Sequence, residues 1–266
     1  MSKKHKEAVQ KQFTKTADAF AKFVVRDTPE VLAEKVEFAK LQPGDRVLDV
    51  ACGPGAFVLA AAPRVTFANG IDLTPEMLRQ AREFQMEKQI ANAAFACADA
   101  EQIPFPDASF DLASCQFAFH HMTRPELVFK ELLRVTKPEG RILLIDTLGP
   151  ESDSKFELHN EIEKLRDPTH TASLRLTTFL SFFDEHQLEL LRQALRRRPR
   201  SFNQWMLRAG LSPGQKRFVQ TRALLQESIP GDKAGFSAKA DGEDIQIIHN
   251  EGMFLLKRRN SGAGRE

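Results

Sequence analysis

The sequence predicts an α/β fold in which helices cover both faces of a mostly parallel sheet. Between residues 46 and 146, short apolar runs typical of buried strands alternate with stretches of helical periodicity. Turn residues separate them, as at Gly53-Pro54-Gly55 and Pro138-Glu139-Gly140. Parallel strands need long crossovers, which are usually helices, so this alternation indicates a parallel sheet.

The first 41 residues are expected to form an N-terminal helical segment. Gln10, Phe13 and Ala17 recur at helical spacing along its first half. Thr28-Pro29-Glu30 supplies a capping hydroxyl, a proline in the first turn and an early acid, which together predict the start of a second helix.

Residues 42–150 are predicted to form the core of the sheet. Strands are expected at 47–50, 65–72, 93–98, 110–117 and 141–146. The expected helices between them are 56–62, 75–89 and 125–136.

After residue 150 the regular alternation ends. Residues 151–200 are polar and are predicted to form a helical insertion that caps the substrate site. Residues 201–258 are expected to complete the core, with a helix containing Trp205 and strands near 217–226 and 252–257. A disordered tail is predicted at 259–266.

Composition excludes several classes of protein. The 38 basic and 36 acidic side chains leave a formal charge of only +2, which argues against general nucleic-acid binding. The basic cluster at 192–200 is therefore interpreted as a solvated helix end, with a nucleic-acid patch as the alternative.

No apolar run is long enough for a membrane span, and no signal-peptide core is present, so we expect a cytoplasmic protein. Three cysteines without metal-ligand spacing predict no metal site.

The strongest motif is a glycine turn directly after the first predicted strand. Asp49 lies in that strand, and Gly53 and Gly55 follow it at the edge where open α/β sheets bind ligands. A dinucleotide fingerprint is disfavoured because Val58 occupies the place of its third small residue. A phosphate-binding P-loop fails because no Gly-Lys-Ser/Thr follows.

Acidic residues mark three consecutive strand ends. Asp49, Asp72 and Asp99 belong to the first, second and third predicted strands, whose carboxyl ends share one edge. A carboxylate buried in an apolar strand is costly unless it accepts hydrogen bonds or faces a cation. We therefore expect the three acids to converge on one ligand cleft.

With these motifs the sequence resembles the class I S-adenosylmethionine-dependent methyltransferases, and especially the ubiquinone/menaquinone-biosynthesis branch. The matching stretches are VLDVACGPGAF, GIDLTPEML, FACADAEQIPFPDASFDLA, FAFHHM and ELLRVTKPEGRILLID. The resemblance implies a Rossmann-like sheet of seven strands whose last strand, 252–257, is antiparallel and lies beside the strand near 217. The sequence departs from the commonest pattern at Cys52-Gly53-Pro54, where a hydroxyl usually follows the first glycine.

The resemblance also implies which residues hold the cofactor, S-adenosyl-L-methionine. Its methionine part would lie on Asp49, Gly53 and Gly55, and its ribose hydroxyls would bind Asp72. The adenine would contact Leu73, Met77, Asp99 and Ala100, and Cys115 and Gln116 would line the sulfonium. No metal is implied.

The acceptor side is expected at His120 and His121, just after the fourth predicted strand. One imidazole would act as general base, since imidazole titrates near neutrality and the chain contains no tyrosine. Alternatively, one histidine caps the next helix and the other packs. The segment Arg166-Asp167-Pro168-Thr169-His170 resembles a short motif of some related enzymes, with a solvated loop as the alternative.

The sequence thus favours transfer of a methyl group to carbon or oxygen of a small, apolar, hydroxylated and aromatic acceptor. Ser114-Cys115-Gln116-Phe117 is not the Asn-Pro-Pro-Tyr type of segment that base methylation favours, so no nucleic-acid partner is expected. The alternatives are a non-catalytic cofactor-binding or scaffolding protein and a nicotinamide-dependent oxidoreductase. No sequence feature indicates the oligomeric state.

Overall fold

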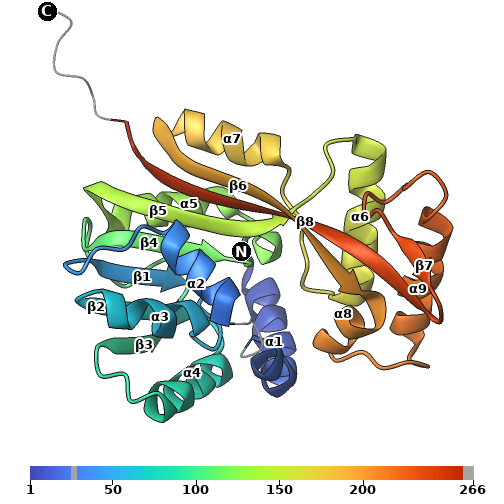
Figure 1. Cartoon of the computed structure of the whole chain (residues 1–266), viewed down its shortest axis with the longest axis horizontal. Coiled ribbons are helices and arrows are strands. Elements are labelled where there is room, and N and C mark those ends of the chain that lie inside the picture. Colours follow the sequence, from blue (N-terminus) through green and yellow to red (C-terminus); the bar gives the residue numbers. More distant parts are fainter. Residues whose placement is uncertain (25–28, 260–266) are drawn as a thin grey trace, which may run out of the picture.

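The computed structural model, which describes residues 1–24 and 29–259, contains the predicted parallel sheet. Its first five strands run parallel in the order β3-β2-β1-β4-β5 (Figure 1). This order brings the carboxyl ends of β3, β2, β1 and β4 side by side along one edge. The strands are β1 Arg46–Val50, β2 Phe67–Asp72, β3 Ala93–Cys97, β4 Phe110–Gln116 and β5 Thr136–Leu148.

Helices cover both faces of this sheet. Successive side chains of a strand point to opposite faces, so Val47 and Leu48, both fully buried, belong to two different apolar clusters. Leu48 packs in the cluster that contains α5 (Pro125–Val135) and α7 (Leu176–Glu185). Val47 packs in the cluster of α2 (Pro29–Phe38), α3 (Ala56–Ala61) and α4 (Pro75–Glu87). A short 3₁₀ turn, η1 (Ala62–Arg64), follows α3.

The far side of the sheet confirms the antiparallel last strand but not its predicted neighbour. β8 (Asp244–Arg258) runs antiparallel between β5 and β6 (Leu188–Ser201). The segment near 217–226, expected to be a strand, belongs to the helix α9 (Lys216–Ser228). Phe218, Thr221 and Leu225 are buried at intervals of three and four residues, which is the spacing of one helix face.

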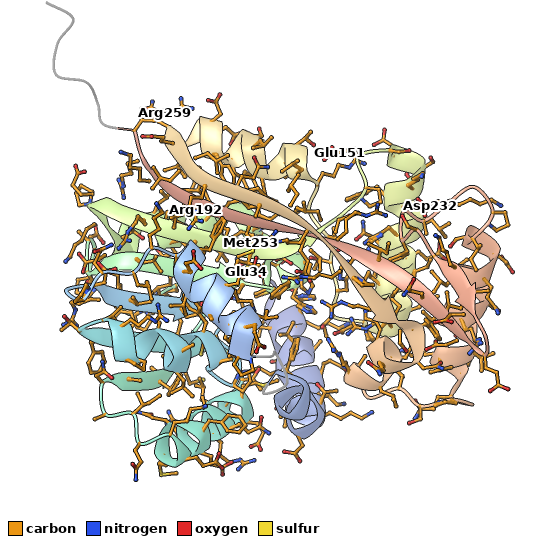
Figure 2. The ribbon with its side chains drawn as sticks, in the orientation of Figure 1. Glu34, Glu151, Arg192, Asp232, Met253 and Arg259 are labelled. Atoms are coloured by element: carbon orange, nitrogen blue, oxygen red, sulfur yellow. The ribbon has the colours of Figure 1, made fainter. Side chains whose placement is uncertain are left out.

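The prediction of an all-helical insertion at 151–200 is wrong from residue 188 onwards. α6 (Asp153–Arg166) and α7 are helical, but residues 188–200 belong to β6. Arg196 and Arg198 bind Glu34 of α2, and Arg198 and Arg200 bind Glu251 of β8. The basic cluster is thus an edge strand whose arginines pair with acids, and not a helix end. Glu34 and Arg192 mark this contact of α2 with β6 in Figure 2.

The long strands β6 and β8 continue past the sheet into a second lobe (Figure 1). α6, α8 (Phe202–Arg208), α9 and the short β7 (Lys239–Asp241) surround them. Phe202, Met206, Phe236 and Ile247 are fully buried in this lobe's own apolar cluster. Most of residues 201–258, together with α6 and the end of β6, therefore builds a second lobe, and only β8 returns from it to the sheet.

α1 (Lys3–Val24) lies between the two parts and contacts α4 and α8. The predicted cap Thr28 and residues 260–266 of the predicted tail 259–266 lie outside the described residues. Arg259, the first residue of that tail, donates its N–H to the backbone oxygen of Gln187 at 2.8 Å. Within the described ranges, no helix combines the length and apolar character needed to cross a membrane.

Substitution of Phe254 tests whether β8 lies inside the sheet. Its ring is fully buried and lies 5.5 Å from that of Phe179 and 5.3 Å from that of Phe183, centroid to centroid. Phe254→Ala should lower the free energy of unfolding by about 3–5 kcal/mol, the usual cost of emptying a buried aromatic site. Urea denaturation measures it, with the half-exposed Leu195 of the edge strand β6 as control. Equal costs for Phe254→Ala and Leu195→Ala would contradict the central position of β8.

Candidate active site

A cavity of about 180 Å³ lies at the carboxyl ends of the strands, bounded by residues of α1 and α2. Nine of the twelve residues singled out from the sequence line it. They are Asp49, Gly53, Asp72, Leu73, Met77, Asp99, Ala100, Gln116 and His121. Gly55, Cys115 and His120 do not line it.

The floor of the cavity is the turn after β1. Ala51, Gly53 and Gly55 have φ angles of 56°, 52° and 78°, a left-handed region that favours glycine. The Asp72 carboxylate holds the turn, because Oδ2 accepts the Gly53 N–H at 2.9 Å and Oδ1 accepts the Thr74 N–H at 2.8 Å.

Gly55 serves the turn by its small size and does not line the cavity. A Cβ at this position would lie 2.7 Å from the ring of Phe95, so a larger residue would displace the ring. The predicted contact of Gly55 with the ligand is therefore corrected to a steric role.

Asp49 is the most deeply buried of the three acids. It is 3% exposed and accepts a hydrogen bond from the Ser114 hydroxyl, which faces it across the β1–β4 pair. Burial raises the pKa of Asp49 to about 7, although the Ser114 hydrogen bond and the charge of Lys35 favour the ionised form. Burial likewise raises the pKa of Asp72, against the hydrogen bonds from Thr74 and Gly53.

Asp99 lies where the chain leaves β3, and α1 is anchored to it. Lys6 of α1 binds the Asp99 carboxylate and also Glu101, the latter at 3.0 Å. Gln10 of the same helix donates to the backbone oxygen of Leu73 at 2.8 Å. The three acids thus converge on one cavity as predicted, and α1 covers them.

The two residues at the end of β4 face opposite sides of the sheet. Gln116 lines the cavity, and its amide nitrogen Nε2 is buried without an acceptor among the described residues. Cys115 points into the core beneath α5 and is fully buried. Burial raises the pKa of its thiol well above the usual value. The predicted place of Cys115 at the sulfonium is therefore corrected, because adjacent strand residues alternate between faces.

Several lining residues were not expected from the sequence. Val9 and Phe13 of α1, and Leu32 and Lys35 of α2, contribute to the wall. The Lys35 ammonium lies 5.2 Å from the ring centroid of Phe117, which also lines the cavity. The helical seam of Gln10, Phe13 and Ala17 predicts an amphipathic N-terminal helix that closes over the cofactor, and packing in the core explains the same spacing equally well.

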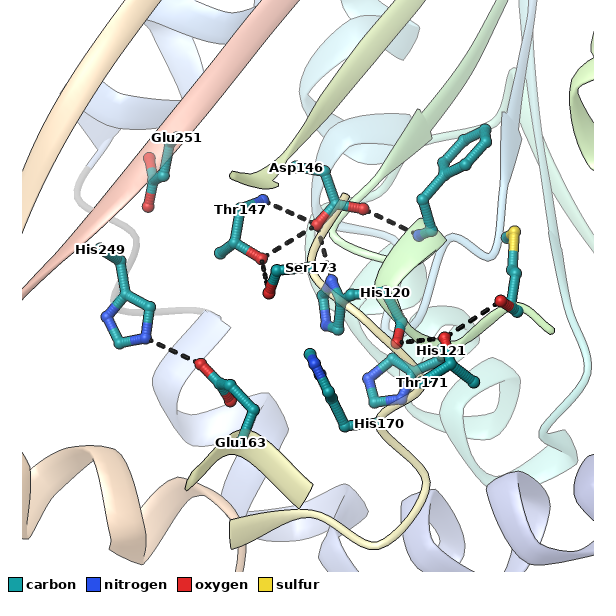
Figure 3. A network of polar contacts seen from close by, with 12 residues as sticks. His120, His121, Asp146, Thr147, Glu163, His170, Thr171, Ser173, His249 and Glu251 are labelled. Carbon is teal, nitrogen blue, oxygen red and sulfur yellow. Dashed lines mark hydrogen bonds and ion pairs between the residues drawn. The ribbon is translucent and has the colours of Figure 1, made fainter. Parts of the chain in front are cut away.

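The two neighbouring histidines have different surroundings: one lines the cavity and the other contacts a buried carboxylate behind it. His121 lines the cavity, whereas the Nδ1 atom of His120 lies 2.6 Å from Oδ1 of the buried Asp146 (Figure 3). Burial alone would lower the pKa of His120, but the Asp146 carboxylate outweighs it and raises that pKa. Burial, together with the charge of His120, lowers the pKa of His121 to about 4.

The segment 166–170 is not a solvated loop. Asp167, Thr169 and His170 are buried, and the ring of His170 lies 5.5 Å from that of His120. Thr171 donates its N–H at 2.7 Å and its hydroxyl at 2.9 Å to the backbone oxygen of His120. Figure 3 shows the side chain of Thr171 next to His120 and His121.

The cavity fits a ligand that carries both charge and hydrogen-bonding groups. It is lined by the acids Asp49, Asp72 and Asp99, by Lys35 and by Gln116, whose buried amide nitrogen has no acceptor among the described residues. Across the described residues, no three histidine, cysteine or acidic side chains are grouped as metal ligands.

Known proteins resemble this chain in sequence and in fold. Residues 48–144 match the family described as "Methyltransferase domain". The chain is 32% identical to the uncharacterized methyltransferase YcgJ of Bacillus subtilis, over 88% of this chain and 93% of that protein. The crystal structure of YcgJ superposes with a TM-score of 0.79 at 29% identity, covering 86% of this chain and 98% of the other.

Two further matches are to a relative with a named reaction and to a more distant solved structure. The ubiquinone/menaquinone biosynthesis C-methyltransferase UbiE of Ectopseudomonas mendocina is 35% identical over 43% of this chain and 46% of its own length. A methyltransferase of Thiobacillus denitrificans, solved with S-adenosyl-L-homocysteine, shares the fold with a TM-score of 0.55 and 20% identity, covering 87% and 92% of the two chains. The acids at three adjacent strand ends and the similarity to these methyltransferases lead to the same conclusion. The chain belongs to the class I S-adenosylmethionine-dependent methyltransferases.

Proposed function

We propose that the protein transfers the methyl group of S-adenosylmethionine to carbon or oxygen of a small, apolar, hydroxylated aromatic acceptor. The observation that carries this proposal is the composition of one cavity. Its charged groups come from β1, β2, α2 and the segment directly after β3, and much of the remaining wall is apolar. His121 is the imidazole in that wall.

The residues at the strand ends are suited to hold the cofactor. Asp49 and Lys35 would bind the ammonium and carboxylate of its amino-acid part, and the buried amide of Gln116 would donate to one of its oxygens or to the acceptor. The Asp72 carboxylate, which accepts the Gly53 and Thr74 N–H groups and lines the cavity, would also accept the ribose hydroxyls. Asp99 would accept the adenine amino group beside its bond to Lys6. When bound, the cofactor supplies a methyl group on a positively charged sulfur that leaves as a neutral thioether.

The acceptor would lie against the apolar wall, whose side chains include Phe13, Phe117 and Met122. These groups exclude water and orient the acceptor, which is catalysis by proximity. The neutral imidazole of His121 would take the proton that a phenol loses during attack. The name of the relative UbiE describes a carbon methyltransferase, which favours carbon over oxygen as the acceptor atom.

S-Adenosylhomocysteine should raise the melting temperature of the protein. A ligand that binds only the folded state adds about 2.7 kcal/mol at one hundred times its dissociation constant. Asp72→Ala should remove most of this stabilisation, because both the ribose contact and the fixed turn are lost. Asp184→Ala, which removes a mostly exposed carboxylate remote from the cavity, is the control and should keep the shift. No shift of the wild-type protein at millimolar ligand would contradict cofactor binding.

Cofactor affinity should rise with pH through the titration of Asp49. Its pKa is about 7 in the ligand-free protein, and a bound ammonium group would favour the carboxylate and lower that pKa. Affinity for S-adenosylhomocysteine should therefore increase about tenfold from pH 6 to pH 8 and then level off, as the ionised fraction does. Calorimetry measures this, and Asp49→Asn should bind weakly and lose the pH dependence. A flat wild-type profile would refute the pairing of Asp49 with the ligand's cation.

His121, and not His120, should be the histidine on which turnover depends. His121→Ala should lower kcat by about 10²–10⁴-fold, the usual contribution of a general base, with cofactor affinity little changed. The wild-type rate should fall only as the pH approaches 4, the pKa of His121, because a protonated imidazole cannot act as a base. His120→Ala removes the neighbouring charge, so it should move this limb to higher pH. Release of S-adenosylhomocysteine with alkylated phenols as acceptors measures the rate. Normal turnover of His121→Ala would exclude the base role.

A further inference from the structure

The loop after α6 presses its polar groups against the histidine pair. α6 ends at Arg166, because Asp167 precedes Pro168 and takes an extended conformation with φ −132° and ψ 107°. The Asp167 side chain is 6% exposed. Beyond it, Thr171 binds the backbone oxygens of His120 and Met122 at 2.9 and 3.0 Å (Figure 3). The loop is thus fixed to the segment that carries both histidines.

Asp167 directs the hydroxyl proton of Thr169. Its Oδ1 accepts the Thr169 N–H at 2.9 Å and the Thr169 hydroxyl at 2.7 Å. Burial alone would raise the pKa of Asp167, but the nearby His121 and the hydrogen bonds from Thr169 lower it. An ionised carboxylate only accepts hydrogen bonds, so the single hydroxyl proton of Thr169 points to Asp167.

This arrangement leaves only acceptors beside Nδ1 of His121. The Thr169 hydroxyl oxygen and the Thr169 backbone oxygen both lie 3.2 Å from that nitrogen. Two acceptors require that Nδ1 carries the proton. A neutral imidazole has one N–H, so its Nε2 holds a lone pair.

We propose that Asp167 and Thr169 are a positioning pair that holds His121 as the Nδ1–H tautomer and leaves Nε2 as the basic nitrogen available to the cavity. The pair acts through His121, so its catalytic consequence rests on the proposed function. The other titratable groups around His121 are His120 and His170, whose rings lie 4.4 and 6.4 Å away, the charge of Asp146, and His5, which binds the His121 backbone oxygen.

His170 offers an internal reference of the opposite tautomer. Its Nε2 lies 2.9 Å from Oδ1 of Asn160, which also accepts the Ser173 N–H at 2.8 Å. The amide of Asn160 donates to the Phe156 backbone oxygen at 2.9 Å, which fixes Oδ1 as the acceptor. His170 therefore carries its proton on Nε2, and burial lowers its pKa to about 2, so it is neutral at pH 7.5.

The test is a nitrogen-15 NMR spectrum of the full chain with labelled histidine at pH 7.5, assigned through His121→Ala and His170→Ala. His121 should show a protonated Nδ1 and an unprotonated Nε2, and His170 should show the reverse. A proton on Nε2 of His121 would overturn the proposal, whatever the activity. The expected tautomer together with normal turnover of His121→Ala would instead refute the proposed base and leave the positioning pair standing.

Variants of Thr169 connect the tautomer to the rate. Thr169→Val removes one of the two acceptors, so kcat should fall about two- to tenfold, as for loss of one neutral hydrogen bond. The nitrogen-15 signals of His121 should also shift, and Thr169→Ser should restore both these signals and kcat. Thr221→Val, at a fully buried threonine of α9, is the matched control and should leave both unchanged. An unchanged spectrum in Thr169→Val, or no recovery in Thr169→Ser, would contradict a role of the hydroxyl.

Discussion

The carboxylate of Asp72 joins two strand ends into one surface, and the rest of the site is built on that surface. It accepts one N–H from the turn after β1 and one from the start of α4. The turn needs such an anchor because Ala51, Gly53 and Gly55 all adopt left-handed backbone angles. Its backbone can then face the cavity without a side chain in between. The same carboxylate lines the cavity, so one group both shapes the wall and faces the ligand.

Parallel strand order explains how the remaining groups reach this surface. In the sequence β3-β2-β1-β4, the carboxyl ends present Asp99, Asp72, Asp49 and then Gln116. Burial makes the Asp49 and Asp72 carboxylates costly to ionise in the ligand-free protein, as their raised pKa values show. A ligand with matching charge and hydrogen-bonding groups relieves that cost. The site is therefore suited to a polar, charged cofactor and not to an apolar molecule alone.

The sheet from β1 to β5 could be predicted because its strands are apolar and its turns carry glycine and proline. β6 could not, because an edge strand keeps one side in water and its arginines make it look like a polar helix end. The acids at the strand ends could be predicted from chain position. Lys35, Phe13 and the support of His121 by Thr169 could not, because they depend on how distant segments pack together. The resemblance implies that Cys115 and Gln116 both face the cofactor, but neighbouring residues of a strand point to opposite faces, and only Gln116 lines the cavity.

The proposed function requires that S-adenosylmethionine binds in the cavity with its methyl group close to His121, the base that takes the acceptor's proton. An NMR spectrum of the complex, with carbon-13 only in that methyl group, tests it most directly. The account predicts magnetisation transfer from the methyl protons to the ring protons of His121. Contacts of the labelled methyl with residues beside Asp99 instead, in a complex of the same affinity, would contradict it.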